Sequence, residues 1–298
     1  MSSHQSSSLE AKTLLTGLVI GESPRWHEGR LWFAHWGTDE IVAVDLDGKA
    51  EVVVGGVRAT APPGLGWSID WLPDGRLLVT GEALMRIEPD GSMVRHADLS
   101  GLGVDGFNEI VVDGRGNIYV NGGCDFAPGE GRAPGIIALV TPDGSVRRVA
   151  DGIAFPNGMA VTPDNSTLII AESFAGRLTA FDIADDGGLS NRRVWADGVG
   201  PDGICMDAEG AVWTGVGGMG DNLIGRVREG GEVLDQVQLD MPSFACMLGG
   251  EDARTLFTLT ADWRIADGFE ENITRLTEGP RTGRLSTVPA PAPRAGWP

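Results

Sequence analysis

Cysteine and histidine are scarce in this chain of 298 residues, and their scarcity disfavours several kinds of site. The three cysteines, Cys124, Cys205 and Cys246, lie far apart and form no C-x-x-C pair. We therefore expect neither a disulfide framework nor a thiolate metal site. The four histidines are scattered as well, and no two have the spacing of a ligand pair, which disfavours a histidine-based zinc site.

Long apolar runs are also absent. No stretch approaches the roughly 18 consecutive apolar residues that a membrane-spanning helix needs, so we expect no membrane partner. The opening MSSHQSSSLEAK has no apolar centre, which argues against a secretory signal peptide and suggests a disordered tail over residues 1–11. These absences predict a soluble cytoplasmic protein.

Positive charge is in short supply. The chain has 23 basic and 42 acidic residues, which gives a net charge of −19. An acidic surface repels phosphate backbones, so we expect no nucleic-acid partner. Solubility explains most of the excess acid, although a few carboxylates gathered around a cation would contribute to it.

Turn-forming residues, in contrast, are abundant. Glycine supplies 45 residues, about twice its average share. Asp-Gly and Asn-containing pairs recur in segments such as DLDG at 45–48 and TPDG at 141–144, and such pairs supply the positive φ of tight hairpins. Between them lie apolar runs of strand length, whereas runs long enough for amphipathic helices are scarce. This pattern predicts an all-β protein.

The expected strands fall into six repeated units. Each unit has a small or polar opening, a first strand, a tight turn and further strands. The openings lie near Glu22, Ser68, Asn108, Asn157, Asp202 and Ser243. Successive openings are 40 to 49 residues apart, the spacing of four-stranded propeller blades. No Pro/Ser-rich linker or shift in composition supports the alternative of two domains, so the sequence predicts a six-bladed β-propeller.

A propeller must also close its ring. The sixth unit shows only three clear strands, whereas the segment KTLLTGLV at 12–19 has no partner next to the first unit. We expect this N-terminal strand to pair into the last blade as its outer strand, which removes an exposed sheet edge. The propeller domain would then span residues 12–289, and the Pro-rich residues 290–298 would run along the surface as a tail.

Four of the openings carry an oxygen-bearing side chain at an equivalent place. They are Glu22 in GESPRW, Asn108 in FNEIVVD, Asn157 in FPNGMAV and Asp202 in GPDGICMD. Taken alone, each residue is better explained as a strand cap or a turn former. Arranged around a ring, however, the four side chains converge on one point. Carboxylate and amide oxygens suit Ca²⁺, Mg²⁺ or Mn²⁺, so the set predicts a site for one divalent cation.

Five stretches of the chain, taken in order, resemble the SMP-30/gluconolactonase/LRE-like (regucalcin) family. They are GESPRW at 21–26, FN at 107–108 with VVDGRGNIYV after it, NG at 157–158, PDGICMDAEGAVW at 201–213 and FACMLGGEDARTLFTLTA at 244–261. The resemblance implies a six-bladed β-propeller that binds one divalent cation, often calcium, at the end of its central channel. It also implies hydrolysis of a lactone, or of another ester or an organophosphate.

The same resemblance implies roles for the four recurring residues. Glu22, Asn157 and Asp202 look like the metal ligands, and Asn108 looks like a residue that completes the shell or contacts the substrate. We expect the cation to be Ca²⁺, with Mn²⁺, Mg²⁺ and Zn²⁺ as alternatives.

The reaction that such a site suggests is ring-opening hydrolysis of a lactone. The cation would polarise the carbonyl and stabilise the tetrahedral oxyanion. Asp202 is the candidate base, and hydroxide bound to the cation is the alternative nucleophile. A serine nucleophile is disfavoured, because the chain lacks G-x-S-x-G and neither Ser23 nor Ser173 has an evident histidine partner.

Three further residues are candidates for contacting the substrate. Trp67 and Asp70 lie at the opening of the second unit, where Trp67 would form a pocket wall and Asp70 would bond to substrate hydroxyls. Packing between blades is the alternative for Trp67. His35 is either a proton carrier facing the channel or a satisfied turn histidine. The Gly/Pro-rich segments 122–135 and 215–225 are candidate lids or plain connections.

At one position the chain departs from the animal sugar lactonases of this family. Those proteins place an arginine two residues before the third-unit asparagine, where it contacts the substrate. Here that residue is Gly106. We therefore expect a more apolar lactone or ester as substrate. Two alternatives remain open, a promiscuous esterase or phosphotriesterase on the same metal site and a calcium-binding propeller without catalysis.

Overall fold

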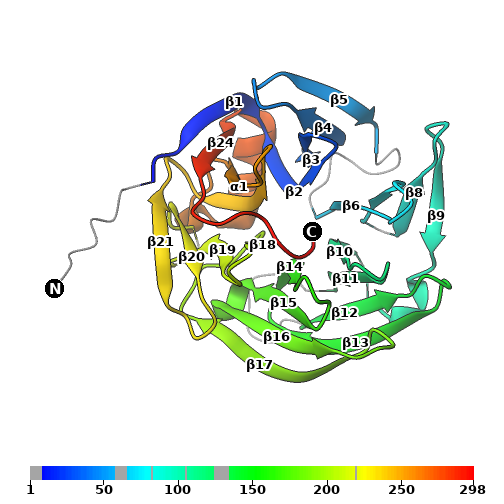
Figure 1. The fold of residues 1–298 in the computed structure, drawn as a ribbon. Coiled ribbons are helices and arrows are strands. Elements are labelled where there is room, and N and C mark those ends of the chain that lie inside the picture. The colour runs from blue at the N-terminus through cyan, green and yellow to red at the C-terminus, as the bar shows by residue number, and fades with distance from the viewer. Residues whose placement is uncertain (1–8, 58–65, 82, 105, 124–133, 219) are drawn as a thin grey trace.

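The structure is a computed structural model that describes residues 9–57, 66–81, 83–104, 106–123, 134–218 and 220–298. Within these residues, six four-stranded sheets stand around a common centre (Figure 1). Strands β2, β6, β10, β14 and β18, each the first of its blade, lie nearest that centre. The predicted all-β class and six-bladed β-propeller are confirmed.

The first three blades follow one another along the chain. Blade 1 holds β2 (Ile20–His27), β3 (Arg30–Trp36), β4 (Glu40–Val44) and β5 (Ala50–Gly55). Blade 2 holds β6 (Ile69–Trp71), β7 (Leu77–Val79), β8 (Leu84–Ile87) and β9 (Met93–Ala97), and the short helix η1 (Ser100–Leu102) follows it. Blade 3 holds β10 (Phe107–Val112), β11 (Ile118–Gly122), β12 (Gly135–Val140) and β13 (Val146–Ile153).

The other three blades complete the ring. Blade 4 holds β14 (Pro156–Val161), β15 (Thr167–Glu172), β16 (Arg177–Ile183) and β17 (Leu189–Asp197), with the short helix η2 (Ser173–Ala175) after β15. Blade 5 holds β18 (Cys205–Met206), β19 (Val212–Gly215), β20 (Leu223–Val227) and β21 (Val233–Gln238). Blade 6 holds β22 (Ser243–Gly249), β23 (Thr255–Thr260), β24 (Gly283–Pro289) and β1 (Lys12–Leu18).

The N-terminal strand closes the ring, as predicted. β1 is the outer strand of blade 6 and pairs antiparallel with β24, for example Lys12 with Thr287 and Leu18 with Gly283. The last sheet therefore combines strands from both ends of the described chain. Because β2 follows β1 directly, this pairing ties blade 6 to blade 1.

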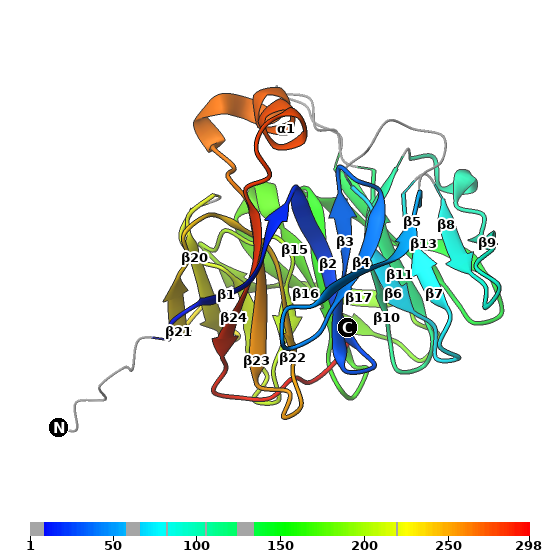
Figure 2. The same cartoon turned by 90° about the horizontal axis from the view of Figure 1, so that it is seen from above.

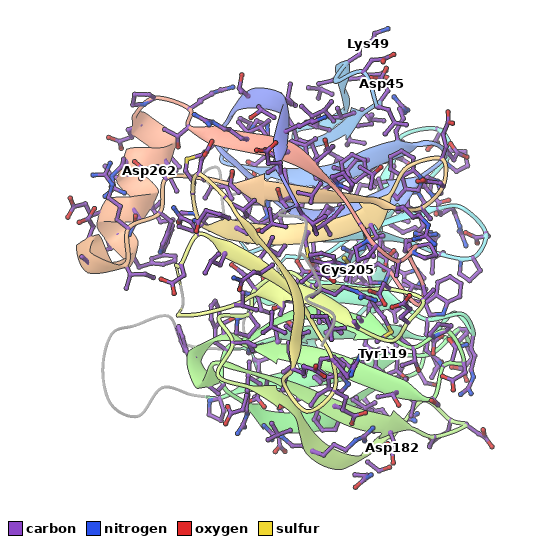
Figure 3. All side chains as sticks on the ribbon, turned by 60° about the vertical axis from the view of Figure 1, so that its left-hand side comes forward. Asp45, Lys49, Tyr119, Asp182, Cys205 and Asp262 are labelled. Atoms are coloured by element: carbon purple, nitrogen blue, oxygen red, sulfur yellow. The ribbon has the colours of Figure 1, made fainter. Side chains whose placement is uncertain are left out.

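The Asp-Gly turns explain where many of the acidic side chains lie. In the turn after β4, Asp45 Oδ1 accepts hydrogen bonds from the backbone N–H groups of Asp47 (3.0 Å) and Lys49 (2.9 Å). The same arrangement recurs at Asp113 and Asp207. Figure 3 shows Asp45 and Lys49 at the outer edge of the molecule. Part of the excess negative charge is thus used to fix turns.

The core lies mainly between neighbouring blades. The cluster around blade 6 includes Phe33, Trp213 and Phe257, of which none is more than 1% exposed. Each such side chain stabilises the fold by about 1.5–3 kcal/mol relative to an exposed position. The apolar strand runs that predicted the fold are therefore the ones that pack blade against blade.

One helix departs from the predicted all-β pattern. α1 (Gly268–Glu278) follows the short helix η3 (Ile265–Asp267) in the connection from β23 to β24, and it stands clear of the strands at one end of the ring (Figure 2). Within α1 only Asn272 and Leu276 are buried, and Leu276 packs in a cluster with Val19. Its apolar residues Phe269, Ile273 and Leu276 recur at i, i+4 and i+7, a helical pattern that the search for repeated strands did not use. No helix in the described part of the chain is long and apolar enough to cross a membrane.

Residues 290–298 lie across the other end of the ring, where the inner strands finish. Trp297 and Val161 exchange backbone hydrogen bonds of 2.9 and 2.8 Å, and the N–H of Ala295 donates to the carbonyl oxygen of Met206 at 3.1 Å. Figure 1 places the last residue near the centre of the ring. The segment that we expected as a surface tail is thus fixed to this face by backbone hydrogen bonds.

A fully buried carboxylate, Glu172 at the end of β15, holds blade 4 together. Its Oε1 accepts hydrogen bonds from the side chains of Arg177 (3.0 Å) and Arg192 (2.9 Å). Thr179 Oγ1 also donates to it at 2.5 Å, and the backbone N–H of Ala154 donates to Oε2 at 2.9 Å. Burial by itself raises the pKa of Glu172, but these hydrogen bonds and the charge of Arg192 outweigh it, so the pKa lies below its ordinary value.

We expect Glu172→Gln to lower the free energy of unfolding by about 1–3 kcal/mol at pH 7, because it removes the charge that two arginines contact. The folded-state pKa lies below the ordinary value of 4.5, so this contribution is complete above the unfolded-state pKa and is lost as the pH falls through the folded-state pKa. Urea unfolding of both proteins at neutral and acid pH measures the difference, which should shrink toward acid. Glu251→Gln, at an exposed turn, is the control; the same pH dependence in that variant would contradict the assignment.

Candidate active site

β-Bulges shape the openings of the inner strands. The pairing of β2 with β3 is irregular between Glu22 and Arg25. Similar irregularities surround Asn108 in β10 and Asn157 in β14. A bulge places two residues opposite one and changes the direction of their side chains. Three of the predicted polar residues therefore lie where the alternating in-and-out pattern of the strand breaks.

Glu22, Asn157 and Asp202 lie near one another at the end of the ring where the inner strands begin. The side chain of Asn157 lies close enough to the carboxyl of Asp202 to lower its pKa, and the charges of Glu22 and Asp202 act on each other. The backbone N–H of Gly158 donates to the carbonyl oxygen of Asp202 at 3.2 Å, which ties the opening of blade 4 to that of blade 5. Glu22 and Asn157 are buried and Asp202 is half-buried.

The fourth predicted residue, Asn108, lies beside this group. Its Nδ2 donates to the carbonyl oxygen of Pro156, the residue before Asn157, at 3.4 Å. Its own carbonyl oxygen accepts a hydrogen bond of 2.7 Å from the hydroxyl of Thr80, which fixes the start of β10 to blade 2. The structure thus brings side chains from blades 1, 3, 4 and 5 to one end of the channel.

Two charged residues in the same place were not predicted. Glu109 in β10 is 3% exposed, and its charge acts on both Glu22 and Asp202. Arg25 Nη2 lies 3.6 Å from Glu109 Oε2, and Arg25 Nε lies 3.7 Å from Asp70 Oδ1. The repeat pattern pointed to one residue at each opening, whereas the bulges also place a neighbouring residue in the site. The signal that was available is the additional charged residue in each motif, Arg25 in GESPRW and Glu109 in FNE.

These carboxyl groups are short of positive charge. Burial, followed by the charges of Asp202 and Glu109, holds the pKa of Glu22 well above its ordinary value. Burial and the charge of Glu109 raise the pKa of Asp202 to about 8, against the lowering effect of the Asn157 side chain. Burial raises the pKa of Glu109 to about 7, although Arg25 acts in the other direction. A cation placed here would be stabilised by all three groups.

Two residues that we expected to contact the substrate instead contact other parts of the protein. Trp67 is completely buried, and its carbonyl oxygen accepts a hydrogen bond of 2.7 Å from Trp36 Nε1. This is the placement of an inter-blade packing residue rather than of a pocket wall. Asp70 accepts a hydrogen bond of 2.9 Å from the backbone N–H of Val112 and lies 3.7 Å from Arg25. Its carboxylate therefore contacts protein groups instead of facing open solvent.

His35 has the environment of a structural histidine. Its Nε2 accepts a hydrogen bond of 3.0 Å from the backbone N–H of Val19, and its Nδ1 lies 3.4 Å from Glu40 Oε2. Burial lowers its pKa, against the charge of Glu40. Since both ring nitrogens have protein partners, the satisfied-histidine interpretation fits this placement better than a substrate contact.

The remaining sequence candidates are placed as follows. Cys205 and Cys246 are buried free thiols with their sulfur atoms 3.8 Å apart, and Figure 3 shows Cys205 well inside the ring. Cys124 and most of the candidate lid 122–135 lie outside the described residues. In the second candidate lid, 215–225, the backbone around Asp221 forms a local turn.

The donor set at the channel end fits a hard cation. No group of three or more His, Cys, Asp and Glu side chains in the described ranges is close enough to hold a metal ion by itself. The expected shell contains only two such residues, Glu22 and Asp202, and relies on the amide oxygens of Asn157 and Asn108 for the rest. Mixed carboxylate and amide oxygens are what Ca²⁺ accepts in proteins.

The sequence profile of the SMP-30/gluconolactonase/LRE-like region matches residues 20–262, which include all six openings. The chain belongs to the SMP-30/gluconolactonase/LRE-like family. The resemblance inferred from the five stretches is therefore confirmed. Among the curated relatives of this chain, the lactonase drp35 of Staphylococcus saprophyticus is 29% identical over 167 residues. The matched region covers 51% of this chain and 50% of that protein. The chain spans about half the length of the curated relatives it matches.

Solved structures share the fold of this SMP-30/gluconolactonase/LRE-like chain. A luciferin-regenerating enzyme is similar with a TM-score of 0.78 at 18% identity, over 97% of both chains. The calcium-binding protein regucalcin of Agrobacterium tumefaciens is similar with a TM-score of 0.72 at 21% identity, again over 97% of both chains. At these identities the likeness shows the propeller fold alone.

The contact between the openings of blades 4 and 5 is testable at Gly158. A Cβ atom there would lie 2.6 Å from the backbone nitrogen of Ile204 and 2.7 Å from the carbonyl oxygen of Asp202. Because backbone must move to relieve both contacts, we expect Gly158→Ala to lower the free energy of unfolding by about 1–3 kcal/mol. Gly55→Ala, where a Cβ meets nothing within 4 Å, is the matched control. Equal stability of the two variants in urea unfolding would contradict the close approach.

Proposed function

We propose that the protein is a divalent-cation-dependent hydrolase that opens lactones or cleaves related carboxylic esters. The observation that carries the proposal is the meeting of Glu22, Asp202 and two asparagine side chains from separate blades at one end of the channel. A structural scaffold has no need of such a group, since enclosing like-charged carboxylates costs stability. Membership of the family and the lactonase name of drp35 support the proposal.

Glu22, Asn157 and Asp202 would hold the cation, and Asn108 would either complete the shell or contact the substrate. Two carboxylates match the charge of one divalent ion, and oxygen donors favour Ca²⁺ ahead of Mn²⁺, Mg²⁺ or Zn²⁺. When bound, the cation supplies polarisation of the ester carbonyl and stabilisation of the charge that develops on its oxygen.

Asp202 is the residue that would move the proton. Its carboxyl lies beside the side-chain amide of Asn157, at the end of the ring where the substrate carbonyl would lie. It takes a proton from the attacking water as the new C–O bond forms. When the ring C–O bond breaks, the same proton passes to the departing alkoxide oxygen, and the product is a hydroxy acid. Asn108 can donate to a substrate oxygen through its amide.

Loss of the cation is expected to abolish hydrolysis of lactones, and adding back the native cation should restore it. We expect Glu22→Gln to weaken cation binding by about 10- to 100-fold or more, because it removes one of two ligand charges. Glu270→Gln, an exposed carboxylate on α1 at the same end of the ring, is the matched control and should bind like the unaltered protein. Calorimetric titration of the stripped proteins with Ca²⁺, Mn²⁺, Mg²⁺ and Zn²⁺ measures this; equal affinity of both variants would contradict the ligand assignment.

The base role is tested separately by Asp202→Asn at saturating cation. We expect kcat to fall by about 10²- to 10⁴-fold, the usual contribution of a positioned base. Full activity with the cation bound would rule out Asp202 as the base. Cation binding by the unaltered protein without hydrolysis of any lactone or ester would indicate a cation-binding propeller, and a preference for phosphotriesters would favour the promiscuous alternative.

A further inference from the structure

Aromatic side chains form two clusters beside the polar site. In the first, Phe155 and Phe174 stack with their ring centroids 4.5 Å apart. In the second, Trp263 lies between Phe244 and Phe269, with centroid distances of 5.7 and 5.8 Å and edge-on geometry. Phe174 is 39% exposed and Phe269 is 43% exposed. Each cluster therefore combines packed rings with one partly exposed side chain.

Backbone hydrogen bonds between neighbouring blades connect both clusters to the polar residues. Phe155 precedes the blade 4 asparagine by two residues. In the same blade, the N–H of Gly158 donates to the carbonyl oxygen of Asp202 at 3.2 Å. The N–H of Gly203 in turn donates to the carbonyl oxygen of Phe244 at 2.8 Å. These two hydrogen bonds connect blade 4 to blade 5 and blade 5 to blade 6. Phe155 and Phe244 lie at the two ends of this connection, and Asp202, the candidate base, lies between them.

Phe155 holds its position at a conformational cost. Its φ is +60°, a region that non-glycine residues enter at a cost of order 1 kcal/mol or more. Two hydrogen bonds maintain it, from the N–H of Ser173 to the carbonyl oxygen of Phe155 at 3.1 Å and from the N–H of Phe174 to that of Ala154 at 3.2 Å. These bonds bring the two phenyl rings together. Strain of this kind concentrates at ligand-binding sites.

The second cluster owes its position to the connection that contains α1. Trp263 and Phe244 pack against the small core under the helix, which includes Ile20 and Ala261. Phe269 is the second residue of α1 and contacts Trp263 from above that core. The only α-helix among the described residues therefore carries a partly exposed phenyl side chain, at the end of the propeller where the polar residues lie.

We infer that these two aromatic clusters bind the non-reacting part of the substrate, and that this part is an alkyl chain or an aromatic ring. The inference rests on the proposed hydrolysis and names its substrate class. Phenyl rings provide apolar contact area but no hydrogen-bond partners for the hydroxyls of a sugar. A lactone with an apolar substituent is therefore favoured over a polyhydroxylated one.

The test is a series of lactones that share one reacting ring. γ-Butyrolactone, γ-heptalactone and γ-nonalactone differ in the length of an alkyl substituent, and D-glucono-1,5-lactone is the polar comparison. We expect kcat/KM to rise along the series by about two- to fourfold per methylene that the rings cover. Phe174→Ala and Phe269→Ala should flatten the rise. Val233→Ala, an apolar side chain of similar exposure (44%) on β21, is the control and should keep it.

Equal kcat/KM across the series, glucono-1,5-lactone as the best substrate, or an unchanged rise in both phenylalanine variants would overturn the inference and leave the proposed hydrolysis standing. If the cation-loaded protein hydrolyses no lactone, the proposed function fails, and binding still decides the inference. Calorimetry should then show γ-nonalactone binding more tightly than γ-butyrolactone, with the difference reduced in Phe174→Ala. Equal binding of the two lactones would refute it.

Discussion

The repulsion among Glu22, Glu109 and Asp202 is the constraint on which the rest of the site depends. Their charges act on one another inside protein surroundings, and burial holds all three pKa values above the ordinary range. Like charges enclosed in protein repel one another more strongly than they do in water. One arginine, Arg25, offsets part of this. Under the proposed function, a cation would compensate the remainder and would supply the carbonyl polarisation that hydrolysis needs.

The propeller can hold such a cluster because its stability comes from elsewhere. Apolar side chains packed between blades, closure of the last sheet by β1 and backbone hydrogen bonds from residues 290–298 stabilise the ring outside the polar end. At that end, bulges turn side chains out of the alternating pattern, and Gly158 allows two blades to approach closely. Most of the elements that stabilise the ring thus differ from the elements that shape the site.

Much of the fold was predictable, because each blade repeats the same local rules. Asp-Gly turns and polar openings at regular spacing predicted six blades, and an unpaired N-terminal strand predicted the closure. Glu22 and Asp202 were chosen as candidates because they recur at equivalent positions. Arg25 and Glu109 were missed, since a bulge has no signature in the spacing. Trp67 could not be assigned from sequence, because a tryptophan that packs between blades and one that faces a pocket look alike.

The central claim is that one cation bridges the openings of several blades. The most direct measurement is anomalous diffraction from crystals of the protein grown with Mn²⁺. We expect one strong peak within about 2.0–2.6 Å of side-chain oxygens of Glu22, Asn157 and Asp202. Peaks confined to the acidic surface turns, with none between these three residues, would contradict it.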